Sequence, residues 1–370
     1  MEGTKKLLVI AGGNYIFGAE KITLDVVEGL KGNGYDVTVI ISGWGDGRFA
    51  AALNALPVKF YKLKLGWYYT SKLLWSLDSL VHYPGAIFRY MSLRKKFRDW
   101  PVYIISFRQV ILLWPFFKKN IVFHVHDLNS NSKQSRYFLK MIDKKVARYI
   151  AVSDFIKNDL VQCGINPQKI EVIHNGITIE NAAVEKNHSS EIFTVGIVGQ
   201  VIERKGHLVM IDALNLLVKR GLKVQLIIAG NGDAKFIAEI KKLIEDHQLA
   251  DHILWREFKT DLLAIYEGMD IVVAPTITGE PFGLIVIEAN MLSLPVIASD
   301  TGGFSETVKD GANGFLVAVQ SPAQIAEKIE YLYFNHDQVD KMGSNGRENV
   351  MQYFDKTIMI KKIDELITNL

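Results

Sequence analysis

The stretch from Ala274 to Val319, APTITGEPFGLIVIEANMLSLPVIASDTGGFSETVKDGANGFLVAV, is the most informative part of this chain. Glu280 precedes a Pro-Phe-Gly turn, and Glu288 follows with E-x7-E spacing inside an apolar run of helical character. The first amides of a helix point outward, and the helix dipole favours negative charge beside them. A carboxylate just before such a turn is not suited to bind phosphate, so we expect Glu280 to bind sugar hydroxyls. Glu288 is placed to bind a ribose diol, and the local residues therefore predict a nucleotide-sugar site.

Length and composition set the wider limits. A chain of 370 residues with 49% hydrophobic residues can bury two cores, so two domains are expected. The formal net charge is only +3, which does not favour nucleic acid as a partner. Cys163 is the single cysteine, so an internal disulfide is excluded, and the opening residues lack the apolar length of a signal peptide. Together these features predict a cytoplasmic location.

The first half of the chain alternates short apolar runs with amphipathic ones. Leu7–Ala11 and Val37–Ile41 are predicted as buried strands, with a helix at Ile22–Lys31 between them. Such a βαβ unit predicts a parallel sheet. The further strands expected in this half are Tyr103–Ser106, Ile121–Val125, Tyr149–Val152 and Ile170–Ile173.

The polar, aperiodic segment Thr178–Glu191 is interpreted as an interdomain linker, after which the alternation restarts. We therefore predict two doubly wound α/β domains, in which ligands bind at the carboxyl ends of strands. The strands expected in the second half are Phe193–Val198, Val224–Ala229, Ile253–Trp255, Ile271–Ala274, Val296–Ala298 and Phe315–Val317. The helices expected there are Leu208–Lys219, Lys235–Asp246, Leu262–Gly268 and Leu284–Met291, and the tail Phe354–Leu370 is predicted as a lysine-rich amphipathic helix.

The E-x7-E spacing, the Pro-Phe-Gly turn and the continuation SLPVIASDTGGFSE resemble the donor site of retaining glycosyltransferases of family four (glycosyl transferases group 1). The resemblance spans nearly the whole chain. It implies an α/β fold of GT-B type, with two Rossmann-like domains facing a cleft. Residues 1–178 would form the acceptor-side domain and residues 179–351 the donor-binding domain, while a last helix of about 352–370 would pack back on the first domain.

The resemblance also assigns residues of the donor site. Lys205, within GQVIERKG at 199–206, matches the lysine that contacts the donor diphosphate. Gln200 stands where the family often has arginine. The adjacent Arg204 is expected to point differently, and whether it compensates for Gln200 stays open. The implied catalytic residues are His126, Lys205 and Glu280, and the implied donor-binding residues are Gly13, Gly18, Arg204, Gly230, Phe282, Gly283, Leu284 and Glu288.

The glycines after the first predicted strand have two interpretations: a tight turn, or a close approach of ligand to backbone. Their spacing is not G-x-G-x-x-G, and no acidic residue ends the second strand, which argues against a dinucleotide site. His126 follows the strand Ile121–Val125, where it can donate to a sugar hydroxyl. His124 is predicted to face the other side of that strand as a packed imidazole, and Ser153 is predicted to cap a helix.

The implied reaction moves a sugar from a UDP- or GDP-sugar to a hydroxyl of a glycan or lipid-linked acceptor, in bacterial cell-surface polysaccharide synthesis. No protein nucleophile and no metal are expected. The run Lys59–Lys119 is basic and rich in aromatic residues, so we expect peripheral contact with the inner face of the cytoplasmic membrane, or else an ordinary solvated face. The backbone of Phe258–Thr260 is expected to hold the base.

Three other functions remain as alternatives. One is a nucleotide-sugar epimerase on the same fold, which the Pro-Phe-Gly turn and Glu280 fit less well than transfer. A second is a non-catalytic sugar-nucleotide-binding module, although only Gln200 departs clearly from the family pattern. The third is a dehydrogenase, which the first glycine loop disfavours. The base, the donor sugar, the linkage and the oligomeric state are not determined by the sequence.

Overall fold

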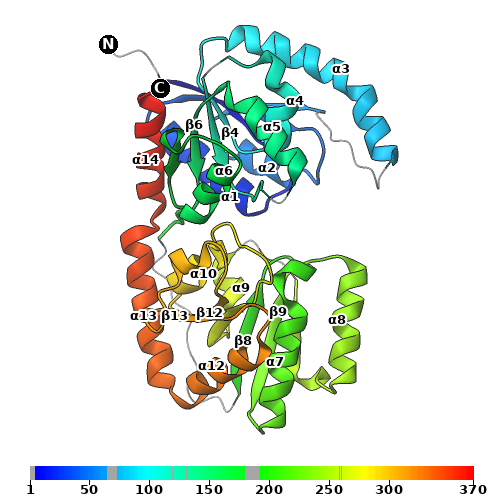
Figure 1. The fold of residues 1–370 in the computed structure, drawn as a ribbon, viewed down its shortest axis with the longest axis vertical. Helices are drawn as coiled ribbons and strands as arrows, with labels where there is room; N and C mark the ends of the chain where they lie inside the picture. Colours follow the sequence, from blue (N-terminus) through cyan, green and yellow to red (C-terminus); the bar gives the residue numbers. More distant parts are fainter. Residues whose placement is uncertain are drawn as a thin grey trace. The chain divides into compact units, whose positions relative to one another are not determined.

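The computed structural model describes residues 5–64, 73–118, 120–130, 132–179, 192–257, 259 and 261–370. The chain forms two compact units, Met1–Gly176 together with Lys356–Leu370, and Ile177–Asp355 (Figure 1). Most of the expected linker Thr178–Glu191, together with Phe258 and Thr260, lies outside the described residues.

The first unit is built on a parallel sheet of seven strands in the order β3-β2-β1-β4-β5-β6-β7. The order reverses between β1 and β4, and such a reversal is where open α/β sheets bind ligands, beyond the carboxyl ends of the strands. The strands are β1 Lys6–Ile10, β2 Asp36–Ser42, β3 Lys59–Leu63, β4 Val102–Ile104, β5 Ile121–Val125, β6 Val146–Ala151 and β7 Ile170–Val172.

Helices lie against this sheet through amphipathic faces. Helix α1, Gly18–Gly32, buries Ile22, Val26 and Leu30 at helical spacing. Ser153 caps α6, Asp154–Gln162, as predicted, because its Oγ accepts a hydrogen bond of 3.1 Å from the amide of Ile156. The other helices of this unit are α2 Arg48–Asn54, α3 Leu73–Lys96, α4 Phe107–Leu113, α5 Lys133–Asp143 and α14 Lys356–Thr368, with short 3-10 turns η1 Trp114–Phe116 and η2 Pro167–Lys169.

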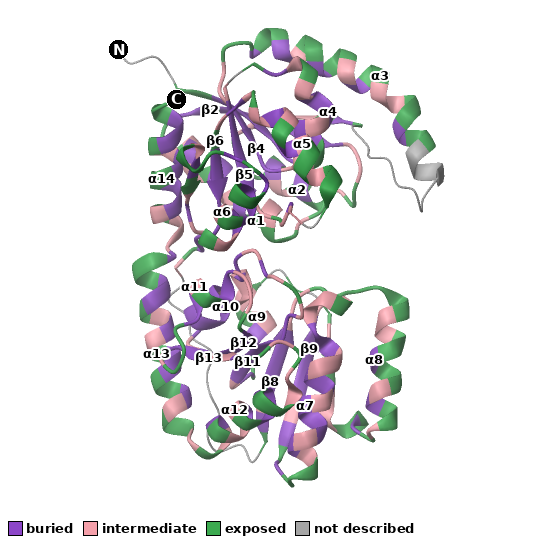
Figure 2. Ribbon diagram, viewed as in Figure 1, coloured by how far each residue is buried: buried purple, intermediate pink, exposed green. Residues whose placement is uncertain are grey.

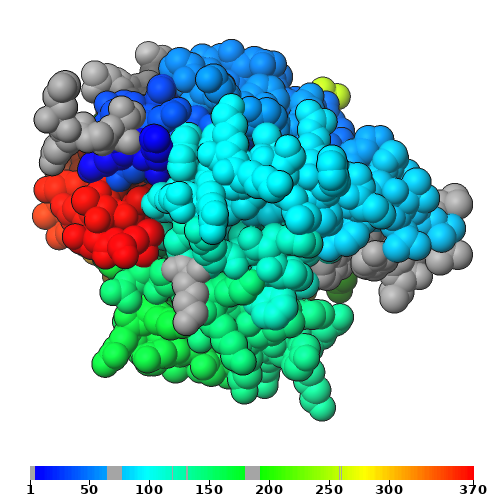
Figure 3. Space-filling view, turned by 90° about the horizontal axis from the view of Figure 1, so that it is seen from above, coloured from blue at the N-terminus to red at the C-terminus, as the bar shows by residue number. Residues whose placement is uncertain are grey.

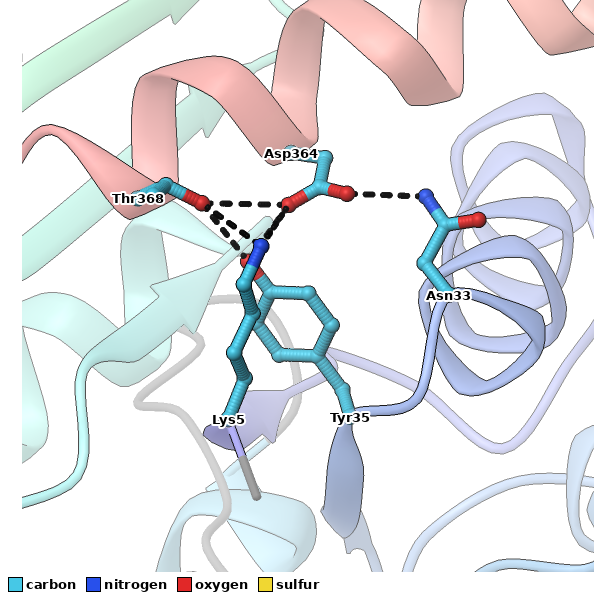
Figure 4. Close-up of polar contacts among 5 residues, drawn as sticks. All are labelled: Lys5, Asn33, Tyr35, Asp364 and Thr368. Atoms are coloured by element: carbon cyan, nitrogen blue, oxygen red, sulfur yellow. Dashed lines mark hydrogen bonds and ion pairs between the residues drawn. The ribbon is translucent and has the colours of Figure 1, made fainter. Parts of the chain in front are cut away.

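The last helix, α14, packs on α1 within the first unit. A Cβ at Gly29 would lie 2.7 Å from the side chain of Ile360, so only glycine allows this approach. The carboxylate of Asp364 accepts hydrogen bonds from Tyr35 Oη at 2.7 Å, Asn33 Nδ2 at 2.9 Å and Lys5 Nζ at 3.2 Å (Figure 4). These bonds fix the end of the chain beside the start of β1.

The second unit is built on a parallel sheet of six strands in the order β10-β9-β8-β11-β12-β13. The strands are β8 Phe193–Val198, β9 Val224–Ala229, β10 Ile253–Arg256, β11 Ile271–Ala274, β12 Val296–Ser299 and β13 Gly314–Val317. The helices are α7 His207–Lys219, α8 Ala234–Asp246, α9 Leu262–Tyr266, α10 Leu284–Met291, α11 Phe304–Thr307, α12 Pro322–Phe334 and α13 His336–Tyr353, with 3-10 turns η3 Glu203–Lys205 and η4 Ala250–His252.

Hydrophobic cores lie on both faces of this second sheet. Val195 and Leu226 belong to the core that includes α7, whereas Val272 and Ala298 belong to the core beneath α10. Figure 2 shows the strands as the buried centre of each unit, with exposed residues on the outer faces of the helices. Strands covered on both faces explain why these segments are continuous apolar runs.

The predicted fold class is confirmed, since both units are doubly wound α/β structures with parallel sheets. Two predicted strand boundaries are wrong: β4 ends at Ile104, with Ser106 as the N-cap residue of α4, and β6 begins at Val146, three residues before the predicted Tyr149. The region Lys59–Lys119 contains β3, α3, β4 and α4. No helix among the described residues has both the length and the apolar character needed to span a membrane.

Candidate functional site

Loops at the carboxyl ends of β8, β9 and β11 interlock through glycines. A Cβ at Gly230 would lie 1.8 Å from the carbonyl oxygen of Gly199, and a Cβ at Gly206 would lie 1.9 Å from that of Pro275. Both glycines also have positive φ, 154° and 73°, which other residues rarely adopt. Because these loops are in such close contact, their backbone positions at the carboxyl edge of the second sheet are fixed. The 3-10 turn η3 lies at this edge.

Three predicted site residues meet at this edge. Lys205 Nζ donates to Glu280 Oε2 at 2.8 Å, and Arg204 Nη1 donates to the same oxygen at 3.2 Å. The Glu280 side chain is only 12% exposed, whereas the Arg204 side chain is 42% exposed. The expectation that Arg204 points away from Lys205 is wrong, because a long side chain on a tight 3-10 turn can reach a partner beside its neighbour. Both cations share one carboxylate.

A glycine pair sets the position of Glu280. The amide of Gly303 donates to the Glu280 carbonyl at 2.7 Å. A Cβ at Gly302 would lie 2.2 Å from that same carbonyl oxygen, and Gly302 has a φ of 65°. Gly302 and Gly303, which follow β12, therefore contact the loop that carries Glu280.

Helix α10 begins immediately after this loop. Gly283, with a φ of 94°, is its N-cap residue and offers no side chain to the first amides of the helix. A Cβ there would lie 2.6 Å from the ring of Phe304, and the side chain of Phe282 is buried. The amides at Leu284 and beyond thus start a helix at the same loop as Glu280, an arrangement that favours an anionic group.

Glu288 lies within α10 and is held by a residue that the sequence did not indicate. Tyr266, at the end of α9, donates its hydroxyl to Glu288 Oε2 at 3.2 Å. Burial raises the pKa of Tyr266, and the charge of Glu288 raises it further, so the phenol stays a donor. No local pattern signals this contact, because the two residues come from different helices.

The first unit carries a separate cluster at the carboxyl end of its sheet. A Cβ at Gly12 would lie 2.5 Å from Ser106 Cβ, and one at Gly13 would lie 3.4 Å from Glu20 Oε1. Burial raises the pKa of Glu20, with a smaller contribution from the charge of Asp127. The glycine loop after β1, which contains Gly12 and Gly13, therefore lies near the residues after β5. Gly18 is exposed at the start of α1.

His126 follows β5 beside this loop. The prediction that His124 faces the other side of the strand is wrong, whereas its prediction as a packed imidazole is confirmed, since His124 is buried. The two imidazole rings are 4.1 Å apart between centroids, because residues two apart on a strand project to the same face. His124 Nδ1 is hydrogen-bonded to the Tyr103 hydroxyl. The Nε2 atoms of both histidines are buried without a hydrogen-bond partner among the described residues.

Burial makes both imidazoles poor bases. It lowers the pKa of His126 to about 3 and that of His124 well below its usual value. Both rings are therefore neutral near pH 7, and His126 Nε2 is a buried polar atom whose hydrogen-bonding capacity is unused among the described residues. No group of three or more His, Cys, Asp or Glu suited to a metal ion occurs among the described residues.

Two protein-family models match the chain. The model described as "Glycosyl transferases group 1" matches residues 178–349, and the model described as "Glycosyltransferase Family 4" matches residues 16–181. The chain belongs to the family 4 glycosyltransferases, as the sequence motifs indicated.

Several curated proteins are similar in sequence. The capsular polysaccharide biosynthesis glycosyltransferase CapM of Staphylococcus aureus is 28% identical over 252 residues, which cover 63% of this chain and 66% of CapM. A phosphatidyl-myo-inositol mannosyltransferase of Mycobacterium tuberculosis is 31% identical over 190 residues, covering 50% of this chain and 48% of the relative. The chain thus matches somewhat under two thirds of the length of CapM and about half of the mannosyltransferase.

Solved structures show the same fold. The Anabaena protein HepE, in complex with UDP and glucose, has a TM-score of 0.82 at 20% identity, covering 99% of this chain and 100% of HepE. A mutant of S. aureus TarM, in complex with Fondaparinux, alpha-GlcNAc-glycerol and UDP, has a TM-score of 0.77 at 16% identity, covering 98% and 99% of the two chains. The predicted GT-B-type fold is thereby confirmed.

Proposed function

We propose that this chain transfers a sugar from a UDP- or GDP-sugar to a hydroxyl of a glycan or lipid-linked acceptor, with retention of anomeric configuration. The observation that carries the proposal is the convergence of Lys205, Arg204 and Glu280 at the loop where α10 begins. Membership of family 4 and the UDP complexes of HepE and TarM support a nucleotide-sugar donor. The name of CapM supports an acceptor in bacterial cell-surface polysaccharide synthesis.

Each residue of the second unit has a role in this proposal. Lys205 and Arg204 bind the diphosphate, together with the amides at Phe282, Gly283 and Leu284. Their positive charge stabilises the negative charge that develops on the leaving nucleoside diphosphate. When the diphosphate binds these cations, the carboxylate of Glu280 becomes available to sugar hydroxyls. The backbone at Gly230 lies close to the donor.

Glu288, oriented by Tyr266, binds the ribose diol. Its carboxylate accepts the hydrogen bond of Tyr266, and a carboxylate is an acceptor suited to adjacent ribose hydroxyls. The first unit supplies Gly13 and Gly18 near the phosphates. His126, whose neutral ring has a buried nitrogen without a partner among the described residues, bonds a hydroxyl of the bound sugar.

Retention follows from attack on the face that the leaving group vacates. The acceptor oxygen forms a bond to the anomeric carbon as the bond from that carbon to the diphosphate oxygen breaks. The departing phosphate oxygen takes the acceptor's proton. Glu280 does not serve as nucleophile in this scheme, because its carboxylate binds hydroxyls of the donor sugar once the diphosphate has taken Lys205 and Arg204. No metal is required in this scheme, since the two cations neutralise the diphosphate.

For a lipid-linked acceptor, the proposal includes a cytoplasmic enzyme with peripheral membrane contact through residues 59–119. Residues 65–72 and 119 of that range lie outside the described residues. Acids are scarce in this range: in the described part they are Asp78 and Asp99.

The decisive experiment is calorimetric titration with a panel of UDP- and GDP-sugars, using the wild type, Glu288→Ala and the matched control Glu245→Ala on the exposed face of α8. We expect one donor to bind, with loss of binding in Glu288→Ala and no change in Glu245→Ala. Slow hydrolysis of that donor to the α-configured sugar, followed by NMR, supports retaining transfer. A folded protein that binds no donor would overturn the proposal. Binding without any hydrolysis or transfer would instead favour a binding module.

A further inference from the structure

Helix α3, Leu73–Lys96, has two apolar faces, although one suffices to pack it on the sheet. One face carries the buried residues Ser79, Ala86 and Tyr90. The opposite face carries a second stripe at helical spacing, whose side chains are exposed. Its members, with their exposed fractions, are Leu77 50%, Leu80 53%, Val81 74%, Phe88 78% and Met91 45%. Pro84 is exposed in the same stripe.

Such a contiguous exposed apolar stripe marks a surface that a membrane or another molecule covers. Singly exposed hydrophobic residues need no explanation, but positions 77, 81, 84, 88 and 91 follow steps of four, three, four and three along one helix face. Between Leu77 and Met91 the only Lys, Arg, Asp or Glu residues are Asp78 and Arg89. Figure 2 shows α3 at the margin of the first unit, with exposed residues along its outer side.

A basic pocket opens at the carboxyl end of the same helix. Its volume is about 510 Å³, and its lining brings together the start of β1, the end of α3 and the end of α14. Figure 3 shows these dark blue, cyan and red segments meeting on one face of the molecule. The charged residues that line the pocket are Lys5, Lys6, Lys95, Lys96, Arg98 and Asp99.

The charge of this pocket is not balanced from within. Asp99 is its only acid, and Asp99 pairs with Lys118 at 3.2 Å. Lys5 is occupied by Asp364, at 3.2 Å. Lys95 and Arg98 have no ion-pair partner among the described residues, and both are exposed. Lys6 lies over the ring of Trp100 at 5.8 Å, so an aromatic wall borders the cations. The pocket therefore suits a phosphate carried by a larger molecule.

We propose that α3 docks on an anionic phospholipid surface. The exposed apolar stripe of α3, which includes Val81 and Phe88, lies at the boundary between the lipid headgroups and the acyl chains. A lipid phosphate binds in the basic pocket beside Lys95 and Arg98. An amphipathic helix with apolar residues on one face and basic residues beside them lies in a membrane interface in this way. Anionic lipid attracts the unpaired cations, while a protein partner of the chain would have to supply acids in the pocket and an apolar groove along the whole helix.

The direction of α3 along the first sheet relates this docking to the carboxyl edge of the sheet. The chain leaves β3 at its carboxyl end, Leu63, and enters β4 at its amino end, Val102, so α3 runs back along the sheet. Its 24 residues span about 36 Å, longer than any strand beside it. A membrane lying along α3 would therefore extend from the basic pocket to the sheet edge that carries the glycine loop. Membrane docking itself does not depend on the proposed function. Its use for the delivery of a lipid-linked acceptor does rest on the proposed function.

The test is co-sedimentation of the full chain with vesicles of phosphatidylglycerol and phosphatidylcholine, compared with vesicles of phosphatidylcholine alone. We expect binding to the anionic vesicles only. Val81→Asp with Phe88→Asp should reduce the binding at least tenfold, and so should Lys95→Glu with Arg98→Glu. The matched controls are Phe334→Asp, an exposed aromatic of the second unit, and Lys219→Glu with Lys242→Glu. Both controls should bind as the wild type does.

A second measurement reports insertion without relying on loss of binding. A polarity-sensitive fluorophore on Phe88→Cys should shift its emission to shorter wavelength on anionic vesicles, and the same label on Phe334→Cys should not. The native Cys163 is only 1% exposed and does not compete for the label.

Equal binding to both kinds of vesicle, binding unaffected by the α3 variants, or no binding at all would each overturn the proposal. Self-association of the chain that is lost in the Val81→Asp, Phe88→Asp variant, without vesicle binding, would show that a second copy covers the stripe instead. Vesicle binding needs no nucleotide sugar, so its outcome is independent of donor calorimetry. A chain that binds vesicles but no donor would overturn the proposed function alone.

Discussion

Lys205 Nζ lies 2.8 Å from Glu280 Oε2, and Arg204 reaches the same oxygen at 3.2 Å, so two cations and one carboxylate form a single charged cluster. The cluster has a net positive charge, and it lies at the loop that starts α10. Lys205 is the less exposed of the two cations, at 18% against 42% for Arg204. Screening by solvent is therefore weaker around Lys205.

From this difference we predict that Lys205→Ala lowers kcat/KM for the donor about 10²- to 10³-fold, as loss of a donor to a developing anion does elsewhere. Arg204→Ala should cost only about tenfold, because its charge is more exposed. Steady-state kinetics with the donor found by calorimetry measures both, with Lys219→Ala as a surface control. Equal losses in the two variants would contradict this ranking of the cations.

A second prediction concerns Gly302 and Gly311, which both have positive φ, 65° and 73°. An added Cβ at Gly302 would meet the Glu280 carbonyl at 2.2 Å, whereas one at Gly311 would meet nothing within 4 Å. Gly311→Ala should thus cost about 1 kcal/mol of unfolding free energy from backbone conformation alone. Gly302→Ala should cost about 3 kcal/mol, because overpacking adds to it.

Chemical denaturation measures both free energies. The Gly302→Ala variant should also lose donor affinity, since the carbonyl that must move belongs to Glu280. If the two substitutions destabilise the protein equally, the close approach of Gly302 to Glu280 is not a constraint on the fold.

How far the sequence predicts this fold depends on burial. Strands covered on both faces, such as Ile121–Val125 and Phe193–Val198, are continuous apolar runs, and the structure has them at the predicted bounds. The edge strand β3, Lys59–Leu63, carries two lysines, Lys59 and Lys62, among few buried positions, and its sequence does not predict a strand. Helix α3 was not recognised either, because apolar residues on both of its faces hide the period of a packed helix.

The candidate site divides in a similar way. Residues that act through local sequence, such as Gly283 before α10, could be identified from the motif. Contacts between distant segments could not: the pair of Tyr266 with Glu288 joins two helices, and the reach of Arg204 depends on the path of its side chain. For His124 the error lay in the strand period, since residues two apart share a face.

A third prediction follows from the bond between Tyr266 and Glu288. Tyr266→Phe removes the hydroxyl that donates to Oε2 at 3.2 Å, and it leaves the packing of the ring unchanged. Glu288 then loses its orientation, so the Kd for the donor should rise about five- to tenfold, the effect expected for the loss of one hydrogen bond of about 1 kcal/mol. Calorimetry checks this, with the exposed Tyr331→Phe as control. An unchanged donor Kd would show that Glu288 is positioned without Tyr266.

The last prediction concerns pH. Burial lowers the pKa of His126 to about 3 and that of His207 to about 4, both below the unfolded value of about 6.5. Between these values the unfolded chain binds a proton that the folded chain does not. Stability therefore falls as pH decreases below about 6.5, by about 1.4 kcal/mol per pH unit for each such histidine. Above pH 7 both states carry the neutral ring, and these histidines contribute no pH dependence.

Urea denaturation of the wild type at pH 7.5, 6.0 and 5.0 should show this decline. His126→Gln should make the slope between pH 6.0 and 5.0 shallower by about 1.4 kcal/mol per pH unit, because the substituted side chain does not titrate. Catalytic activity between pH 6 and 8 should show no inflection from His126, since its ring remains neutral throughout that range. An unchanged slope in His126→Gln would mean that this imidazole is accessible to protons in the folded chain, and that its unpartnered Nε2 is hydrated.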